Sequence, residues 1–100
     1  MDPGIPDLLI ADVVRSTAGR DKGKLFYVLA LDETYLSLVN GKDRTLDKPK
    51  RKKRKHAEKV LRSQTRVAEK IRSGDKVLNS ELRRDLAYLS RELQSSNLGG

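Results

Sequence analysis

Cysteine and tryptophan are both absent from this chain of 100 residues, and aromatic residues are few, with three tyrosines and one phenylalanine. Without cysteine there are no disulfide bonds and no thiolate metal ligands, which favours a reducing, cytoplasmic location. With so few large side chains in so short a chain, we expect a small hydrophobic core. No run of 18 apolar residues occurs, so no membrane-spanning helix is predicted. The first apolar segment has no basic residue before it, and no signal peptide is predicted.

The sequence also lacks the patterns that are typical of catalysis. It contains no P-loop, no nucleophile elbow and no HExxH pair. Its one histidine, His56, has no Cys, His or acidic partner at the spacing of metal ligands. The acidic residues are scattered beside basic ones, so no general acid–base pair stands out. We therefore expect a protein that is not an enzyme and that uses no metal ion, no cofactor and no small-molecule substrate.

Positive charge is abundant but unevenly distributed. The chain holds 22 Lys and Arg against 14 Asp and Glu, a net charge of +8. Residues 1–47 carry six basic and eight acidic residues, and residues 57–100 carry nine and six. Residues 48–56, KPKRKKRKH, carry seven basic residues and no acidic one. A concentrated positive charge of this kind focuses the electrostatic potential and indicates a polyanionic partner.

The first half of the chain has the pattern of short β-strands after a disordered lead at residues 1–6. β-Branched and aromatic residues alternate with turn residues, as in small all-β folds. The predicted strands are Leu8–Val14, Lys24–Leu31, Tyr35–Val39 and a short fourth at residues 42–46. Residues 32–34 are predicted to form a turn, and Asn40-Gly41 a type I′ hairpin turn. Because an open sheet leaves its edges unpaired, we expect the strands to close into a barrel.

The second half changes to the pattern of helices. Residues 56–73 contain no Pro or Gly and repeat apolar residues at helical spacing, which predicts one amphipathic helix that ends at Gly74. A second helix is predicted to begin at Asn79 or Ser80 and to stop before a frayed tail at residues 95–100. Its apolar stripe consists of Leu82, Leu86, Leu89 and Leu93, with Tyr88 packed beside it.

The loop between the first two predicted strands, GRDKGK at residues 19–24, carries three basic residues. Its two glycines let the backbone turn sharply and approach another surface closely. A turn does not need cations, so Arg20, Lys22 and Lys24 suggest a polyanion at one face, with backbone N–H groups as further donors. The loop composition alone fits an ordinary solvated hairpin loop equally well.

The segment ADVVRSTAGRDKGKLFYVLALD, residues 11–32, resembles a KOW motif, in which two strands flank such a loop. The continuation VNGKDRTLDKPKRKKRKH is similar to the segment that follows the motif in certain archaeal and eukaryotic large-subunit ribosomal proteins and their small bacterial relatives. The resemblance covers residues 8–56. The pattern usually has glycine where this chain has Ala11, and often Asp where it has Asn40. Alanine fits there if its backbone angle φ is negative; the fold would then be kept, with a different local entry into the strand.

The resemblance implies a chain that is mainly β with an α appendage, built on a small SH3-like β-barrel that binds RNA, most often ribosomal RNA. The barrel would span residues 7–48, followed by a basic connector at 49–56 and a two-helix region at 57–95. The implied partners are RNA and the large ribosomal subunit, with no membrane. The candidate RNA-binding residues are Arg15, Arg20, Lys22, Lys24, Lys42, Arg44, Lys48, Lys50, Arg51, Lys52, Lys53, Arg54, Lys55 and His56.

Other interpretations stay open. The basic run is also typical of a solvated tail or a nuclear import signal, and duplex DNA is a second polyanion. A small barrel with two amphipathic helices also suits a protein partner, in which case binding would depend on the helix leucines rather than on salt. Phe26 and Tyr27 fall on opposite faces of their strand. We expect one of them in the core and the other covered by a helix or stacked on an unpaired base.

Overall fold

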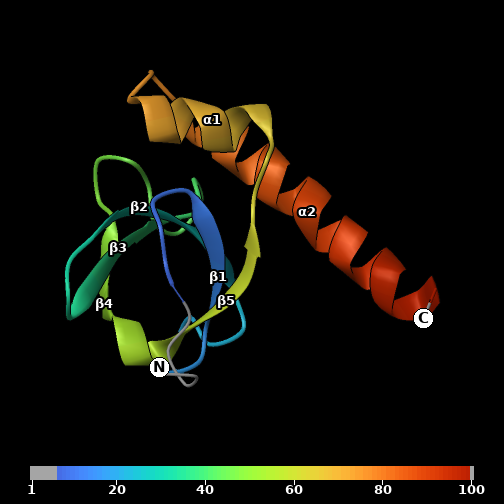
Figure 1. Ribbon diagram of the computed structural model, residues 1–100, viewed down its shortest axis with the longest axis horizontal. Helices are drawn as coiled ribbons and strands as arrows, with labels where there is room; N and C mark the ends of the chain where they lie inside the picture. Colours follow the sequence, from blue (N-terminus) through green and yellow to red (C-terminus); the bar gives the residue numbers. More distant parts are fainter. Residues whose placement is uncertain (1–6, 100) are drawn as a thin grey trace.

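The structure is a computed structural model that describes residues 7–99, with side chains from residue 7 to residue 95. A strongly curved sheet carries two helices along one side (Figure 1). The predicted lead at residues 1–6 lies outside the described residues. The elements are β1 (Asp12–Ser16), β2 (Leu25–Leu31), β3 (Tyr35–Val39), β4 (Lys50–Lys53), a 3-10 helix η1 (Arg54–His56), β5 (Ala57–Arg62), α1 (Arg66–Ser73) and α2 (Asn79–Gly99).

All five strands form one antiparallel sheet in the order β4-β3-β2-β1-β5. The register shifts after Val13 where β1 pairs with β5, and after Val28 where β2 pairs with β3, and such bulges bend a sheet. The predictions of β2 and β3 are confirmed, with β2 beginning one residue later than expected.

The prediction of a closed barrel is wrong, because β4 and β5 are the two edges of the described sheet and do not pair. The helix η1 joins these edges along the chain, and its backbone extends the β3–β4 and β1–β5 ladders instead of pairing β4 with β5. The N–H of Arg54 donates to the carbonyl of Thr34 (2.9 Å), and the carbonyl of His56 accepts from the N–H of Thr17 (2.9 Å). The sheet therefore curls around its core without closing.

Alternating side chains of the strands build two apolar clusters, one on each face of the sheet. Inside the curl the cluster consists of Leu8, Val14, Phe26, Val28, Leu36 and Leu38. On the other face Tyr27 and Val39 pack under the helices, against Leu82, Leu86 and Leu89. Phe26 and Tyr27 are both fully buried, so one is in the core and the other is covered by helices. The expectation for Tyr88 is wrong, because it is 48% exposed.

The prediction of one helix over residues 56–73 is wrong in its first half. Ala57–Arg62 forms β5, which pairs with β1 and places Leu61 opposite Val13. Its apolar residues Ala57, Val60 and Leu61 have helical spacing, and the register shift that skips Val60 lets Val60 and Leu61 pack on the same cluster. Pairing satisfies the backbone groups along an exposed strand, whereas helix propensity differs by less than about 1 kcal/mol per residue among ordinary residues. The sheet thus continues past residue 48 to Arg62.

The two helices begin and end at signals in the sequence. Thr65 caps α1 by accepting a hydrogen bond from the N–H of Ala68 (3.3 Å), and Gly74 ends it with φ of 77°, as predicted. α2 begins at Asn79, as predicted, but runs to Gly99. The predicted fraying from residue 95 is therefore wrong, because an established helix propagates cheaply; Gly100 lies outside the described residues. Within residues 7–99 no helix has the length and apolarity to cross a membrane.

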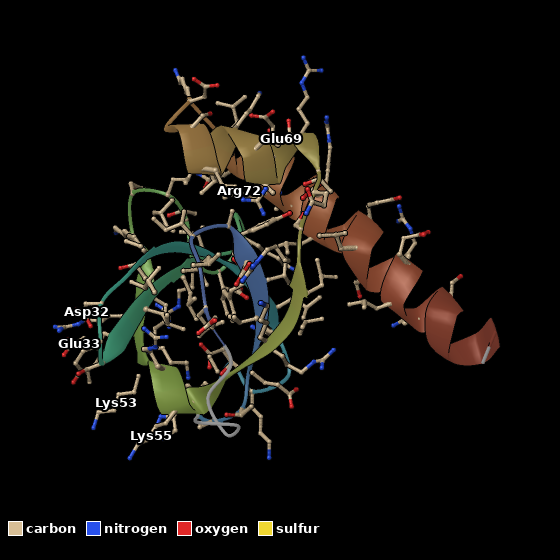
Figure 2. All side chains as sticks on the ribbon, viewed as in Figure 1. Asp32, Glu33, Lys53, Lys55, Glu69 and Arg72 are labelled. Carbon is tan, nitrogen blue, oxygen red and sulfur yellow. The ribbon has the colours of Figure 1, made fainter. Side chains whose placement is uncertain are left out.

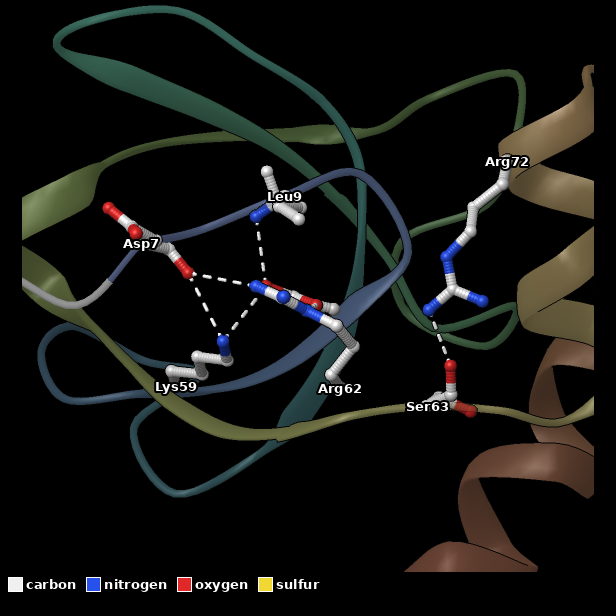
Figure 3. A network of polar contacts seen from close by, with 7 residues as sticks. Asp7, Leu9, Lys59, Arg62, Ser63 and Arg72 are labelled. Atoms are coloured by element: carbon white, nitrogen blue, oxygen red, sulfur yellow. Dashed lines mark hydrogen bonds and ion pairs between the residues drawn. The ribbon is translucent and has the colours of Figure 1, made fainter.

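The first strand begins at Asp12 rather than at Leu8, because a buried carboxylate shapes the chain before it. Asp12 is fully buried, and its carboxylate accepts hydrogen bonds from the N–H of Leu9 (2.8 Å) and from Nε of Arg62 (3.1 Å). Nζ of Lys59 lies 3.6 Å away, and both cations converge on this point from β5 (Figure 3). A buried charge requires such partners, so the backbone turns before β1 to supply one.

Ala11, in this turn, has φ of +71°, and it is the non-glycine residue with positive φ in the described part of the chain. The condition of a negative φ, under which alanine would fit this position, is therefore not met. The N–H of Ala11 donates to the carbonyl of Val28 (2.8 Å), and its methyl group is fully buried. Glycine adopts this left-handed conformation without the steric cost that a side chain adds.

The predicted fourth strand at residues 42–46 is a loop. Oδ1 of Asn40 accepts hydrogen bonds from two backbone N–H groups of this loop, both at 3.0 Å, and holds it in a local turn. Gly41 has φ of +77°, but Asn40 does not have a positive φ, so the predicted type I′ turn is wrong. The fourth strand instead begins at Lys50, inside the basic run.

Candidate nucleic-acid interface

The loop between β1 and β2, residues 17–24, is anchored through its acidic residue. Asp21 is buried; its Oδ1 accepts a hydrogen bond from Oγ of Ser16 (2.8 Å) and lies 3.1 Å from Nζ of Lys52. Burial alone would raise the pKa of Asp21, but the hydrogen bonds from Ser16 and Lys52 outweigh it and hold the pKa below its usual 3.8. Lys52 also donates to the carbonyl of Ala18 (2.8 Å). The acid therefore ties the loop to β4.

The basic residues of this loop divide into two kinds. Arg20 and Lys22 are exposed, and neither takes part in an ion pair with another described residue. Lys24, in contrast, forms an ion pair with Asp43 of the loop between β3 and β4, with Nζ and Oδ2 2.7 Å apart. Two of the three predicted loop cations are thus directed to solvent.

The basic run is folded, not an extended connector. Its first part is β4, an edge strand in which Lys53 lies opposite Tyr35 and Lys52 lies opposite Leu36. Strand alternation turns Lys52 into the curl, where it is 8% exposed, and leaves Arg51 and Lys53 exposed. Lys52, which the resemblance placed among the RNA-binding residues, is therefore occupied by the loop it anchors.

The turn between β2 and β3 meets the end of β4. The guanidinium carbon of Arg51 lies 3.9 Å from the centroid of the Tyr35 ring, and Arg54 donates to the carbonyl of Asp32 (2.9 Å). The carboxylate of Asp32 accepts from the N–H groups of Tyr35 and Thr34 (2.7 and 2.8 Å). These two bonds are the main reason that the pKa of Asp32 is lowered, as expected for a turn-forming aspartate.

Exposed cations gather at the η1 end of the molecule. Lys53 and Lys55 point away from the body there, beside the turn that carries Asp32 and Glu33 (Figure 2). The hydrogen bond between Thr17 and His56 brings the start of the β1–β2 loop against η1. Two basic segments that are distant in the sequence therefore adjoin in the fold.

The remaining candidates lie elsewhere. Arg15 pairs with Glu58 across β1 and β5, with N and O atoms 3.6 Å apart. The candidates in the loop between β3 and β4 are Lys42, Arg44 and Lys48, and the half-buried candidates of the basic run are Lys50, Arg54 and His56.

Sequence reasoning missed Arg83 of α2. Its guanidinium donates to the carbonyl of Gly41 (2.7 Å), and it lines an open groove of about 430 Å³ together with Lys24, Lys42 and Asp43. The groove lies between two loops and α2. Nothing in the sequence pointed to Arg83, because the place of α2 beside these loops is set by packing.

The described residues show no group of three or more His, Cys, Asp or Glu arranged to hold a metal ion. No protein-family model matches the chain, and no curated protein matches it significantly.

Proposed function

We propose that the protein is a non-catalytic RNA-binding protein and that its curled sheet is an SH3-like fold of the KOW type. The pairing of the first and last strands, the two bulges and the 3-10 helix before β5 support the fold. The RNA that we expect it to bind is ribosomal RNA or RNA associated with the ribosome, as in the KOW proteins that the sequence resembles.

One observation carries the RNA proposal: exposed cations stand on two segments that the fold anchors to each other. These cations are Arg20 and Lys22 of the β1–β2 loop and Arg51, Lys53 and Lys55 of β4 and η1. Lys52 and the Thr17–His56 hydrogen bond join the two segments. Because anchored groups lose less conformational entropy on binding, such an array suits the regularly spaced phosphates of a folded RNA. Contacts of this kind position an RNA by shape.

Edge protection is a competing explanation for the basic strand. Lysines on an edge strand prevent edge-to-edge aggregation, and β4 is an edge. This role accounts for Lys53 but not for Arg20 and Lys22, which lie in a loop where no strand edge needs protection. The loop cations are therefore the better indicators of a polyanion.

The protein-partner alternative loses its expected contacts. Leu82, Leu86 and Leu89, on which such binding was expected to depend, are buried inside the chain. Their substitution would now report on folding rather than on a partner. Tyr88 is the exposed aromatic residue of α2 that this alternative retains.

Charge reversal tests the proposal. We expect the protein to bind a fluorescent, folded fragment of ribosomal RNA with a plot of log affinity against log salt whose slope is on the order of −4 for five phosphate contacts. The variant Arg20→Glu/Lys22→Glu/Lys53→Glu/Lys55→Glu should bind about 100-fold more weakly and with a flatter slope.

The matched control places the same charge change on exposed cations of the helical half. It is Arg66→Glu/Lys76→Glu/Arg84→Glu/Arg91→Glu. Its binding should change several-fold less than that of the first variant. Equal losses of RNA affinity in both variants would mean that binding depends only on net charge, which would contradict the proposed interface. A duplex DNA of equal length, used as competitor, should displace the RNA poorly; efficient displacement would favour the DNA alternative.

A further inference from the structure

The outer face of β3 and β4 carries an arginine held against an aromatic ring. The guanidinium carbon of Arg51 lies over Tyr35, 3.9 Å from the ring centroid. In the strand register Arg51 lies opposite Ser37, one diagonal step from Tyr35, which is within reach of long side chains. Tyr35 is half-buried and Arg51 is exposed. One side of the guanidinium plane is thus held by the ring while the arginine remains accessible to solvent.

The helices leave this end of the sheet uncovered. They pack on the same face at Tyr27 and Val39, but Tyr35 is not part of that cluster. Figure 1 shows α1 and α2 at the opposite end of the sheet from the β2–β3 turn. Phe26 and Tyr27 are both fully buried, so Tyr35 is the aromatic residue that the described sheet presents at its surface.

Acidic as well as basic side chains lie near the Arg51–Tyr35 pair. Asp32 and Glu33 of the β2–β3 turn and Lys53 and Lys55 of β4 and η1 lie together at one end of the molecule (Figure 2), and the charge of Arg51 acts on the carboxylate of Asp32. The carboxylate of Asp32 weakens the attraction of Arg51 for a phosphate placed directly over its guanidinium but does not repel an uncharged base. The two lysines attract the phosphates that flank such a base. Unpaired bases commonly stack on arginine planes and on aromatic side chains.

We infer that Arg51, held in place by Tyr35, stacks on an unpaired base of the bound RNA. The inference rests on the proposed RNA-binding function and specifies its substrate: an RNA with a bulged or looped-out nucleotide in preference to an uninterrupted duplex. The charge of Arg51 is not sufficient for this role, because stacking requires the planar guanidinium that lysine lacks.

The test compares two RNA hairpins that share a stem, one fully paired and one with a single bulged 2-aminopurine, whose fluorescence falls when it stacks. The protein should bind the bulged RNA about tenfold more tightly than the paired one and should quench its fluorescence. Arg51→Lys, which keeps the charge on an exposed edge strand, should remove both the preference and the quenching. Lys53→Gln is the matched control, and it should weaken both RNAs by a similar factor while the quenching persists.

The outcomes separate this inference from the proposed function. If Arg51→Lys weakens both RNAs equally, or if the fluorescence falls as much with this variant as with the unaltered protein, the stacking site is refuted and RNA binding stands. If the unaltered protein binds both RNAs equally without quenching, the same conclusion follows. If it binds neither RNA even at low salt, both proposals are refuted.

Discussion

The two glycine-containing loops of the sheet look alike in sequence but are held in different ways. The loop at residues 17–24 is fastened by a side-chain ion pair between Asp21 and Lys52. The loop at residues 40–49 is fastened to α2, where a side chain on Gly41 would come within 2.2 Å of the carbonyl oxygen of Asn79. The first loop keeps its tip exposed, whereas the second leans on a helix.

The difference teaches that cations and glycines in a loop do not by themselves mark a binding site. In the first loop Gly23 bends the chain and faces open space, since nothing lies within 4 Å of a side chain placed on it. In the second loop Gly41 is needed because a helix backbone occupies the space of a side chain. Arg83 and Asn79 complete this contact through hydrogen bonds to Gly41 and Leu46 (2.7 and 2.9 Å).

The largest difference in stability between the two loops is expected when alanine replaces a glycine in each of them. Gly41→Ala adds both a left-handed alanine and a collision with a helix backbone, and should lower the free energy of unfolding by about 3–5 kcal/mol. Gly23 has φ of 90° and faces open space, so Gly23→Ala should lower the free energy of unfolding by only about 1–2 kcal/mol. Urea denaturation measures both. Similar losses in the two variants would mean that the second loop does not rest on α2.

Removing the ion pair addresses the first loop. Lys52→Met leaves the buried carboxylate of Asp21 without its cation and should cost about 3 kcal/mol at neutral pH, whereas Lys53→Met, on the exposed side of β4, should cost under about 0.5 kcal/mol. Because the pKa of Asp21 lies below its usual 3.8, the ionised carboxylate stabilises the fold above about pH 4, and this contribution is lost as the pH falls through the lowered pKa.

The gap in stability between the unaltered protein and Lys52→Met should therefore be full at neutral pH and should narrow below about pH 4. Thermal denaturation across this range provides the measurement. A gap that stays constant down to acid pH would show that Lys52 acts through packing alone. Equal losses for Lys52→Met and Lys53→Met would contradict the anchored loop.

The smallest change in stability is expected when the contact between α2 and the sheet is weakened at Tyr27. The loop at residues 40–49 rests on α2, so this contact supports the loop indirectly. The Tyr27 hydroxyl donates to the carboxylate of Asp85 and lies 2.9 Å from Oγ of Ser63. Tyr27→Phe should lower stability by about 1–2 kcal/mol. In hydrogen exchange it should expose the loop at residues 40–49 more than the loop at residues 17–24, and equal exposure of both loops would count against this coupling.

The dependence of stability on alkaline pH also tests the hydrogen bond between Tyr27 and Asp85. Burial, with the bond to Asp85, raises the pKa of Tyr27 to about 12, above its usual 10. The hydroxyl therefore stabilises the fold fully below about pH 10, and the contribution is lost as the pH rises toward 12. The stability difference between the unaltered protein and Tyr27→Phe should shrink across this window, as followed by urea denaturation. A stability difference that grows as the pH rises toward 12 would contradict the raised pKa of Tyr27.

Local signals were enough for part of the fold. The turn at Asp32, the two strands around it, the end of α1 at Gly74 and the start of α2 at Asn79 depend on residues within a few positions of one another. The basic character of the β1–β2 loop was equally visible. What the sequence did not reveal is that Asp21 anchors this loop, because its partner Lys52 is one of seven similar cations in a row of nine residues.

The sequence by itself determined the turn after β2, the end of α1 at Gly74, the start of α2 at Asn79 and the place where the charge is concentrated. Only the tertiary structure decided that residues 57–62 pair with β1 instead of forming a helix, that the basic run supplies β4, and that Lys52 points inward while Arg51 and Lys53 point outward. The physical reason is that turns and caps are made within a segment. Strand pairing and the choice of the buried face depend on partners distant in the chain, which leave little trace in the segment itself.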